Sequence, residues 1–197
     1  MRPILLSIAL LLAGQAPAGA GFPEGVAAFR RGDYMAALRE FKPLAEKGVA
    51  EAQFNLGVMY RQGLGVNPDF IEARRWYRKA AEQGHPKAQQ NLGVFYADGL
   101  GVKRDAREAA KWFREAAEQG LPAAQRLLGW AYAGGEGVER DLVLALTWLT
   151  LAAARGDAEA GRALPEVMQH MKKSEVAEAR RLAERWEPRG GGPLRRP

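Results

Sequence analysis

The sequence predicts an all-α protein, a right-handed α-solenoid built from helix-loop-helix repeats. One pattern of glycine, tyrosine and tryptophan residues returns every 36 residues, which indicates a repeated structural unit. Each unit contains two stretches with apolar residues at helical spacing, separated by a glycine-rich segment. Because such units bury their apolar faces against their neighbours, we expect a stack with an extended groove.

The first twenty residues differ in composition from the rest of the chain. Arg2 precedes a mostly apolar run over residues 4–13, which is followed by small residues at 18–20. This order predicts a cleavable signal peptide over residues 1–20. The apolar run is too short for a membrane span, which needs roughly 20 residues. We therefore expect a periplasmic or secreted protein without stable membrane insertion.

Residues 21–49 are similar to a short tetratricopeptide-type hairpin, and we expect them to cap the stack at its N-terminal end. The apolar and small residues on either side of Gly32 carry this similarity: Ala27, Ala28, Phe29, Tyr34, Ala37, Leu38 and Leu44.

Three segments then align without gaps, over residues 50–84, 86–120 and 122–156, so the repeats occupy residues 50–156. Four sets of residues recur at the same interval: Gly57, Gly93 and Gly129; Tyr60, Tyr96 and Tyr132; Trp76, Trp112 and Trp148; and Gly48, Gly84, Gly120 and Gly156. A glycine inside a helix costs about 1 kcal/mol relative to alanine. Its recurrence in the first helix predicts that two helices approach closely there, without room for a Cβ atom.

The loop of each repeat contains two glycines and ends on an aspartate. Asp69, Asp105 and Asp141 are expected to cap the second helix. Glu72 and Glu108 follow three residues later, which predicts a capping box in two of the copies.

The motif A-x-x-x-L-G-x-x-Y-x-x-G-x-G-V-x-x-D-x-x-x-A-x-x-W-x-x-x-A-A-x-x-G runs through the middle copy from Ala88 to Gly120. It resembles the Sel-1-like repeat, a relative of the tetratricopeptide repeat with a longer loop between its helices. The resemblance implies adaptor and complex-assembly roles with a protein or peptide partner, but it does not identify that partner.

The C-terminal part is expected to close the stack. Residues 157–188 predict capping helices, the last of them beginning at Ser174, and residues 189–197 predict a disordered basic tail. Such a cap should bury the apolar stretch 142–154. It should also cover Leu127 and Trp130, although these could instead form an exposed anchor.

The residue types argue against catalysis. The chain has no cysteine, and beyond residue 20 its only hydroxyl nucleophiles of the serine and threonine type are Ser174, Thr147 and Thr150. His85 and His170 match no metal-binding spacing and are expected to be surface or capping residues. We therefore predict a protein that is not an enzyme and has no metal or cofactor. The alternative is binding or hydrolysis of β-lactams or related cell-wall compounds, which the resemblance to the Sel-1-like repeat family implies through the cysteine-rich members of that family.

Two surfaces are candidates for partner binding. The first is the groove lined by the first helices, where polar and apolar residues recur at equivalent positions: Asn55, Val58, Gln62, Asn91, Val94 and Asp98. An asparagine amide can both donate to and accept from the backbone of an extended ligand. The alternative is that these asparagines only pack between helices.

The second surface is a basic stripe on the second helices, made of Arg75, Arg78, Arg107, Lys111 and Arg114. In a chain of net charge +6, this stripe could contact an acidic protein or an anionic envelope component. The alternative is a solvated face whose charge is offset by neighbouring glutamates. Nucleic-acid binding is not expected, because the helices lack a recognition element and the protein is expected to be exported.

Overall fold

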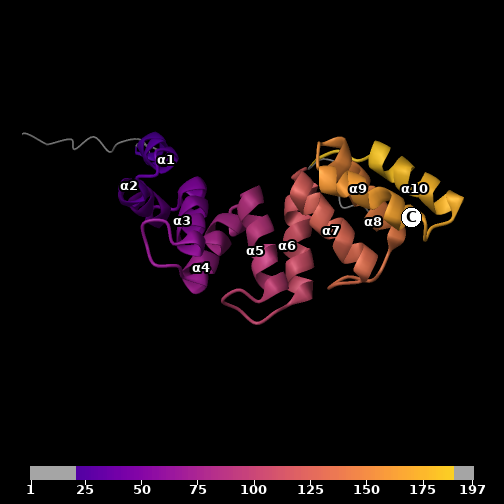
Figure 1. Cartoon of the computed structure of the whole chain (residues 1–197), viewed down its shortest axis with the longest axis horizontal. Coiled ribbons are helices and arrows are strands. Elements are labelled where there is room, and N and C mark those ends of the chain that lie inside the picture. Colours follow the sequence, from indigo (N-terminus) through magenta and orange to yellow (C-terminus); the bar gives the residue numbers. More distant parts are fainter. Residues whose placement is uncertain (1–20, 189–197) are drawn as a thin grey trace, which may run out of the picture.

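The computed structural model describes residues 21–188, which form a stack of α-helical hairpins (Figure 1). The helices are α1 (Phe22–Arg30), α2 (Tyr34–Glu46), α3 (Ala50–Gln62), α4 (Phe70–Glu82), α5 (Pro86–Asp98), α6 (Ala106–Glu118), α7 (Pro122–Gly134), α8 (Leu142–Ala154), α9 (Ala158–Met168) and α10 (Lys173–Glu184). Within the described residues there is no strand, and the predicted all-α solenoid is confirmed. The predicted signal peptide and basic tail lie outside residues 21–188.

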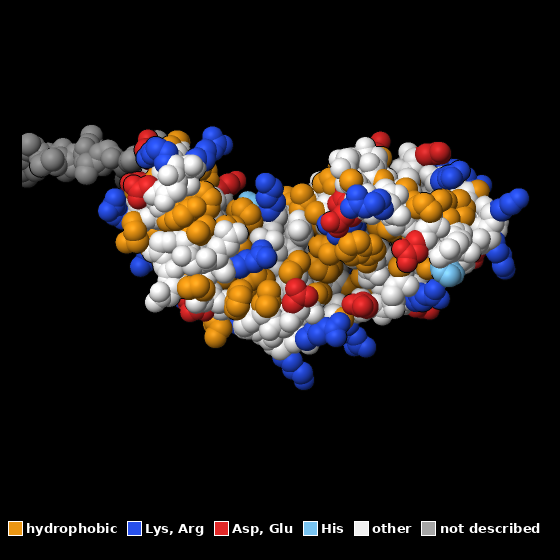
Figure 2. Space-filling model, in the orientation of Figure 1, with side chains coloured by type: hydrophobic (Ala, Val, Ile, Leu, Met, Phe, Trp, Pro, Cys, Tyr) orange, Lys and Arg blue, Asp and Glu red, His pale blue; other side chains and the backbone are white. Residues whose placement is uncertain are grey.

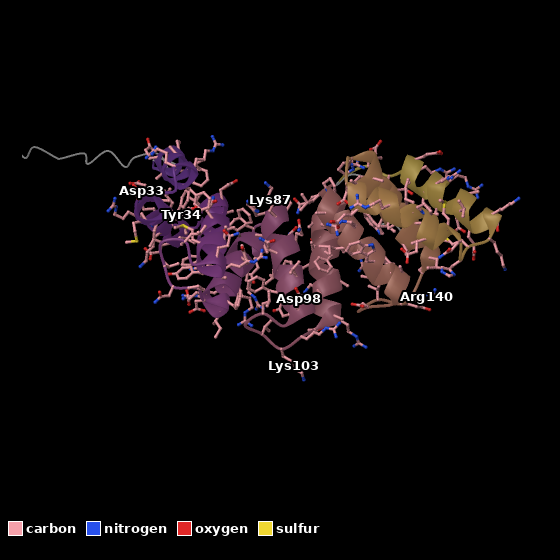
Figure 3. All side chains as sticks on the ribbon, in the orientation of Figure 1. Asp33, Tyr34, Lys87, Asp98, Lys103 and Arg140 are labelled. Atoms are coloured by element: carbon pink, nitrogen blue, oxygen red, sulfur yellow. The ribbon has the colours of Figure 1, made fainter. Side chains whose placement is uncertain are left out.

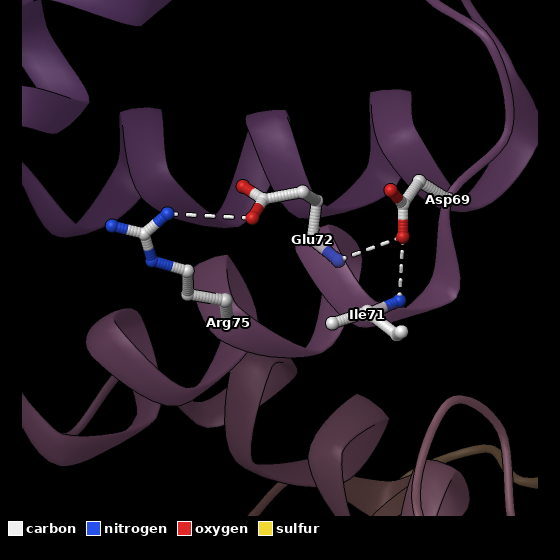
Figure 4. A network of polar contacts seen from close by, with 4 residues as sticks. All are labelled: Asp69, Ile71, Glu72 and Arg75. Carbon is white, nitrogen blue, oxygen red and sulfur yellow. Dashed lines mark hydrogen bonds and ion pairs between the residues drawn. The ribbon is translucent and has the colours of Figure 1, made fainter.

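The aspartates at the loop ends cap the second helices as the sequence predicts. Asp69 accepts hydrogen bonds from the N–H groups of Ile71 and Glu72, at 2.8 and 3.0 Å (Figure 4). Asp105 and Asp141 do the same for α6 and α8.

The capping boxes that the sequence predicts at Glu72 and Glu108 are wrong. Glu72 forms an ion pair with Arg75 at 3.3 Å, and Glu108 forms one with Lys111 at 3.6 Å. The basic residue three positions later lies on the same side of the helix and provides a charged partner for each carboxylate.

The recurring glycines of the first helices mark close helix contacts, as predicted. A Cβ atom at Gly57 would lie 2.5 Å from the ring of Tyr77, and one at Gly93 would lie 2.5 Å from the ring of Phe113. At Gly129 the neighbour is Leu149, at 2.9 Å. The two helices of each repeat therefore pack through a large side chain against a bare backbone.

Buried glutamines join successive repeats, a feature that our sequence analysis missed. The side-chain amide of Gln89 donates to the carbonyl of Ala81 at 3.1 Å, so it binds the end of the preceding second helix. Gln119 in turn donates to Oε1 of Gln89 at 2.6 Å. Gln53 and Gln125 occupy the equivalent positions and bind Ala45 and Ala117. The recurrence of glutamine every 36 residues is the sequence pattern that could have indicated these contacts between repeats.

The C-terminal helices cover α8, and most of its side chains are buried. Trp148 of α8 packs edge to face against Trp186, with 5.9 Å between the ring centroids. The prediction that Ser174 caps the last helix is wrong. Lys172 precedes the helix instead, and its N–H donates to the carboxylate of Glu175 at 2.7 Å. No described helix is long and apolar enough to cross a membrane.

Candidate functional site

A pocket of about 340 Å³ with mainly apolar walls lies between α5 and α7, and we call it the α5–α7 pocket. Val94 and Asp98 of α5 form one wall, and Leu127 and Trp130 of α7 form the other. The floor comes from the first half of α6. Figure 2 shows hydrophobic side chains gathered over α6 and α7 on the viewed face, with acidic side chains at the margin of this area.

Small residues on α6 leave the space that becomes the pocket. The floor contains Ala106 and Ala110, where the first repeat has Phe70 and Arg74. In the third repeat the equivalent residues are Leu142 and Leu146. The pocket therefore lies where α6 carries alanines at two positions that hold larger side chains in the other two copies.

Trp130 forms the open wall of the pocket and is 42% exposed. The prediction that the C-terminal helices cover it is wrong, because α9 and α10 pack mainly on α8. The Arg126 guanidinium lies 4.6 Å from the Trp130 ring centroid. Asp157 and Glu159 each hold this guanidinium at 2.9 Å. The tryptophan is thus exposed, and its ring makes a cation–π contact with a guanidinium that two carboxylates hold in place.

Charged groups border one end of the pocket. Arg104 forms an ion pair with Glu136 at 3.7 Å and donates through Nε to the carbonyl of Ala97 at 2.9 Å. Asp98, labelled at the lower end of α5 in Figure 3, is exposed. Within residues 21–188 its carboxylate has no ion-pair or hydrogen-bond partner. The rim therefore carries one unpaired negative charge.

The other predicted groove residues lie outside this pocket. Asn55 donates to the carbonyl of Glu51 in its own helix at 2.7 Å, and Val58 is half-buried. Gln62 is exposed at the end of α3. Of the six predicted groove residues, only Val94 and Asp98 line the pocket. The sequence left open whether Trp130 is covered or exposed, and it did not reveal the alanines that form the floor of the pocket.

Asn91 approaches the buried side chain of Tyr77. Burial raises the pKa of Tyr77 to about 12, although nearby Arg61 and Asn91 lower it in part. The Tyr77 hydroxyl has no partner in hydrogen-bonding geometry among the described residues, so Asn91 lies near it without forming a hydrogen bond to it.

Most members of the predicted basic stripe have partners within the stack. Arg78 and Arg114 donate to the hydroxyls of Tyr96 and Tyr132 in the following repeats. Arg75 and Lys111 pair with glutamates of their own helices. Arg107 is exposed beside an open polar crevice of about 900 Å³ between two loops. The two arginine–tyrosine bonds give part of the stripe a role in stacking.

His85 caps the first helix of the middle repeat, in agreement with its predicted role. Its Nδ1 atom accepts a hydrogen bond from the N–H of Ala88 at 3.2 Å, and its ring stacks on Phe54 at 4.7 Å. Burial lowers the pKa of His85 below its ordinary value of 6.5, against the opposing charge of Glu51. The folded protein therefore favours the neutral imidazole.

This shift makes stability depend on pH. Below pH 6.5 the unfolded chain binds a proton at His85 more readily than the folded protein does. We expect the His85 contribution to be fully present above pH 6.5 and to be lost as the pH falls from there through the lower pKa of the folded state. Thermal melts at pH ~7.5 and ~5.5 should show a larger loss of stability at the lower pH for the wild type than for His85→Leu. Leucine is the residue at the equivalent position of the third repeat, Leu121. Equal losses would show that His85 does not titrate in this way.

The described residues contain no group of three or more histidine or acidic side chains that could hold a metal ion. Thr147 is fully buried and its hydroxyl donates to the Val143 carbonyl at 2.7 Å. The site offers an apolar pocket with a charged rim, an arrangement that suits the binding of a partner.

These features define a helical repeat protein with an apolar pocket between α5 and α7 of the described stack. The Sel1 repeat family matches three successive segments, residues 50–85, 86–121 and 122–157, which make up more than half of the chain. The chain therefore belongs to the Sel1 repeat family. Proteins with these repeats generally mediate protein–protein interactions, and their fold is typically a non-enzymatic scaffold.

Two solved structures are similar over most of the described stack. One is a protective antigen of uropathogenic Escherichia coli strains with an SLR fold, at 38% identity and a TM-score of 0.75. The match covers 85% of this chain but only 38% of the antigen. The other is a Sel1 repeat protein from Oxalobacter formigenes, at 43% identity and a TM-score of 0.61, with 66% of this chain and 97% of that protein covered. No curated protein matches the chain significantly.

Proposed function

We propose that this protein is an exported, non-enzymatic scaffold that binds an extended segment of a partner protein along the first helices α3, α5 and α7. The observation that carries the proposal is the α5–α7 pocket, an open apolar site whose tryptophan is 42% exposed. Exposed aromatic side chains beside a pocket are typical of the centres of protein interfaces.

The rest of the stack supports a rigid binding surface. The buried glutamines and the arginine–tyrosine bonds fix each repeat against the next. A pre-ordered surface loses little conformational entropy when a partner binds. The family's general role in protein–protein interaction agrees with this proposal.

Export is proposed from the composition of residues 1–20, with Arg2 before a short apolar run. Cell fractionation with N-terminal sequencing tests it. A protein that retains Met1 and stays in the cytoplasm would contradict export, without bearing on the groove.

Capture of a partner tests the groove. Val58 of α3 is half-buried outside the α5–α7 pocket, and we expect Val58→Lys to reduce capture of a crosslinked partner about tenfold, because a lysine interrupts the apolar surface. Ala177→Lys, on the exposed side of α10, adds the same charge and is the matched control. Quantitative mass spectrometry of the captured proteins gives the result. Equal capture by the two variants would argue against binding along α3.

The non-enzymatic part has its own test. The purified protein should not hydrolyse a chromogenic β-lactam or peptidoglycan fragments, since it has no cysteine and few hydroxyl residues, of which Thr147 is buried and bonded within its helix. Turnover that a single substitution abolishes would overturn this part.

A further inference from the structure

We propose that the α5–α7 pocket binds one bulky apolar side chain of the partner, and that the partner carries a lysine or arginine within two residues of it. This inference rests on the proposed groove function and adds the chemistry of the partner. The occupant is an extended protein segment with an aromatic, leucine or methionine residue beside a basic residue.

The size and the lining of the pocket indicate a single side chain. Its volume of about 340 Å³ is at the lower end of the roughly 300–1,000 Å³ that small-molecule pockets span. Ala106, Ala110 and Phe113 give it an apolar floor, and Leu127 and Trp130 give it an apolar wall. An apolar side chain that enters this space leaves water without burying a polar group.

The pocket distinguishes the middle of the stack from the junctions on either side. Position 110 holds alanine, whereas its equivalents are Arg74 and Leu146. Position 130 holds tryptophan, whereas its equivalents in the preceding repeats are Val58 and Val94. The remaining groove can contact many extended segments, so this junction is where one particular residue is selected.

The rim determines the charge of the neighbouring residue. Glu136 is already paired with Arg104, at 3.7 Å, while Asp98 has no such partner within the described part of the chain. A lysine or arginine next to the inserted side chain would supply the missing positive charge. An acidic residue at the same place would meet an unpaired carboxylate. The local charge of the site is thus opposite to the net charge of +6 of the whole chain.

Selection from a random-peptide library displayed on phage, against the purified protein, tests this inference. We expect enriched peptides to share a bulky apolar residue with a lysine or arginine within two positions. Fluorescence anisotropy of one such peptide should show binding about tenfold weaker with Ala110→Leu, which fills the floor, and with Trp130→Val, which removes the wall. Asp98→Asn should weaken binding severalfold at low salt and have little effect at high salt.

Arg75→Ala, outside the pocket, is the control and should bind as the wild type does. Thermal melts separate a loss of binding from a loss of folding, and Trp130→Val keeps the test valid if the more buried Ala110→Leu does not fold. Peptides that bind equally well to all three pocket variants, or that carry acidic residues in place of basic ones, would overturn this inference and leave the groove proposal intact. If no peptide is enriched, the inference is also wrong, and capture through α3 then decides whether the groove binds at all.

Discussion

Gly137→Ala is expected to destabilise the stack by about 3 kcal/mol. Gly137 has φ +72°, and a Cβ atom there would lie 1.9 Å from the carbonyl oxygen of Ala106 and 2.2 Å from its carbonyl carbon. Both atoms belong to the backbone at the start of α6, so no side-chain rotation can relieve the clash. The loop of the third repeat would have to lift away from the second.

Gly156→Ala isolates the cost of backbone conformation. Gly156 has φ +89°, and a Cβ atom there would meet nothing within 4 Å. An L-residue in this region costs about 1–2 kcal/mol without further contacts. Urea unfolding followed by circular dichroism should therefore show a clearly smaller loss for Gly156→Ala than for Gly137→Ala. Equal losses would mean that the loop does not pack on α6 as described.

Gly93→Ala is expected to destabilise the protein by about 2 kcal/mol, although alanine favours a helix more than glycine does. The added Cβ atom would lie 2.5 Å from the ring of Phe113 and 3.2 Å from the carbonyl of Ala109. The Phe113 ring is only 5% exposed, and the Ala109 carbonyl is backbone, which no side-chain rotation can move away. The cost of overpacking should exceed the gain in helix propensity.

Two variants give this expectation its control and its rescue. Gly161 lies inside α9 with its nearest neighbour 4.0 Å from a built Cβ, so Gly161→Ala should stabilise the protein by up to about 1 kcal/mol. Phe113→Leu introduces the residue that faces Gly129 in the third repeat, and it should reduce the cost of Gly93→Ala in a double-mutant cycle. Additive effects would show that Gly93 and Phe113 do not press on each other.

The features that the repeats share could be predicted from the sequence. The mid-helix glycines indicated close contacts because glycine is unfavourable in a helix unless something occupies the place of its side chain. The loop aspartates indicated helix caps because a short acidic side chain reaches the free N–H groups. Each of these signals is local, and each recurs in every copy.

The features that depend on differences between repeats could not be predicted in the same way. The α5–α7 pocket exists because Ala110 stands where the other copies have Arg74 and Leu146, and a difference at one position does not show where space remains. Trp130 was expected to be covered, but whether α9 and α10 reach it depends on how the last helices pack. The buried glutamines recur as regularly as the glycines, but their bonds to the preceding helix required three-dimensional positions.

Site-specific photocrosslinking in the cells that make the protein tests the binding role of the groove most directly. A photoreactive amino acid in place of Gln62, at the exposed end of α3, should form a covalent adduct with a partner protein. The same amino acid in place of Lys111, whose side chain is 60% exposed on α6, should not. Adducts from position 111 with none from position 62 would contradict binding along the first helices.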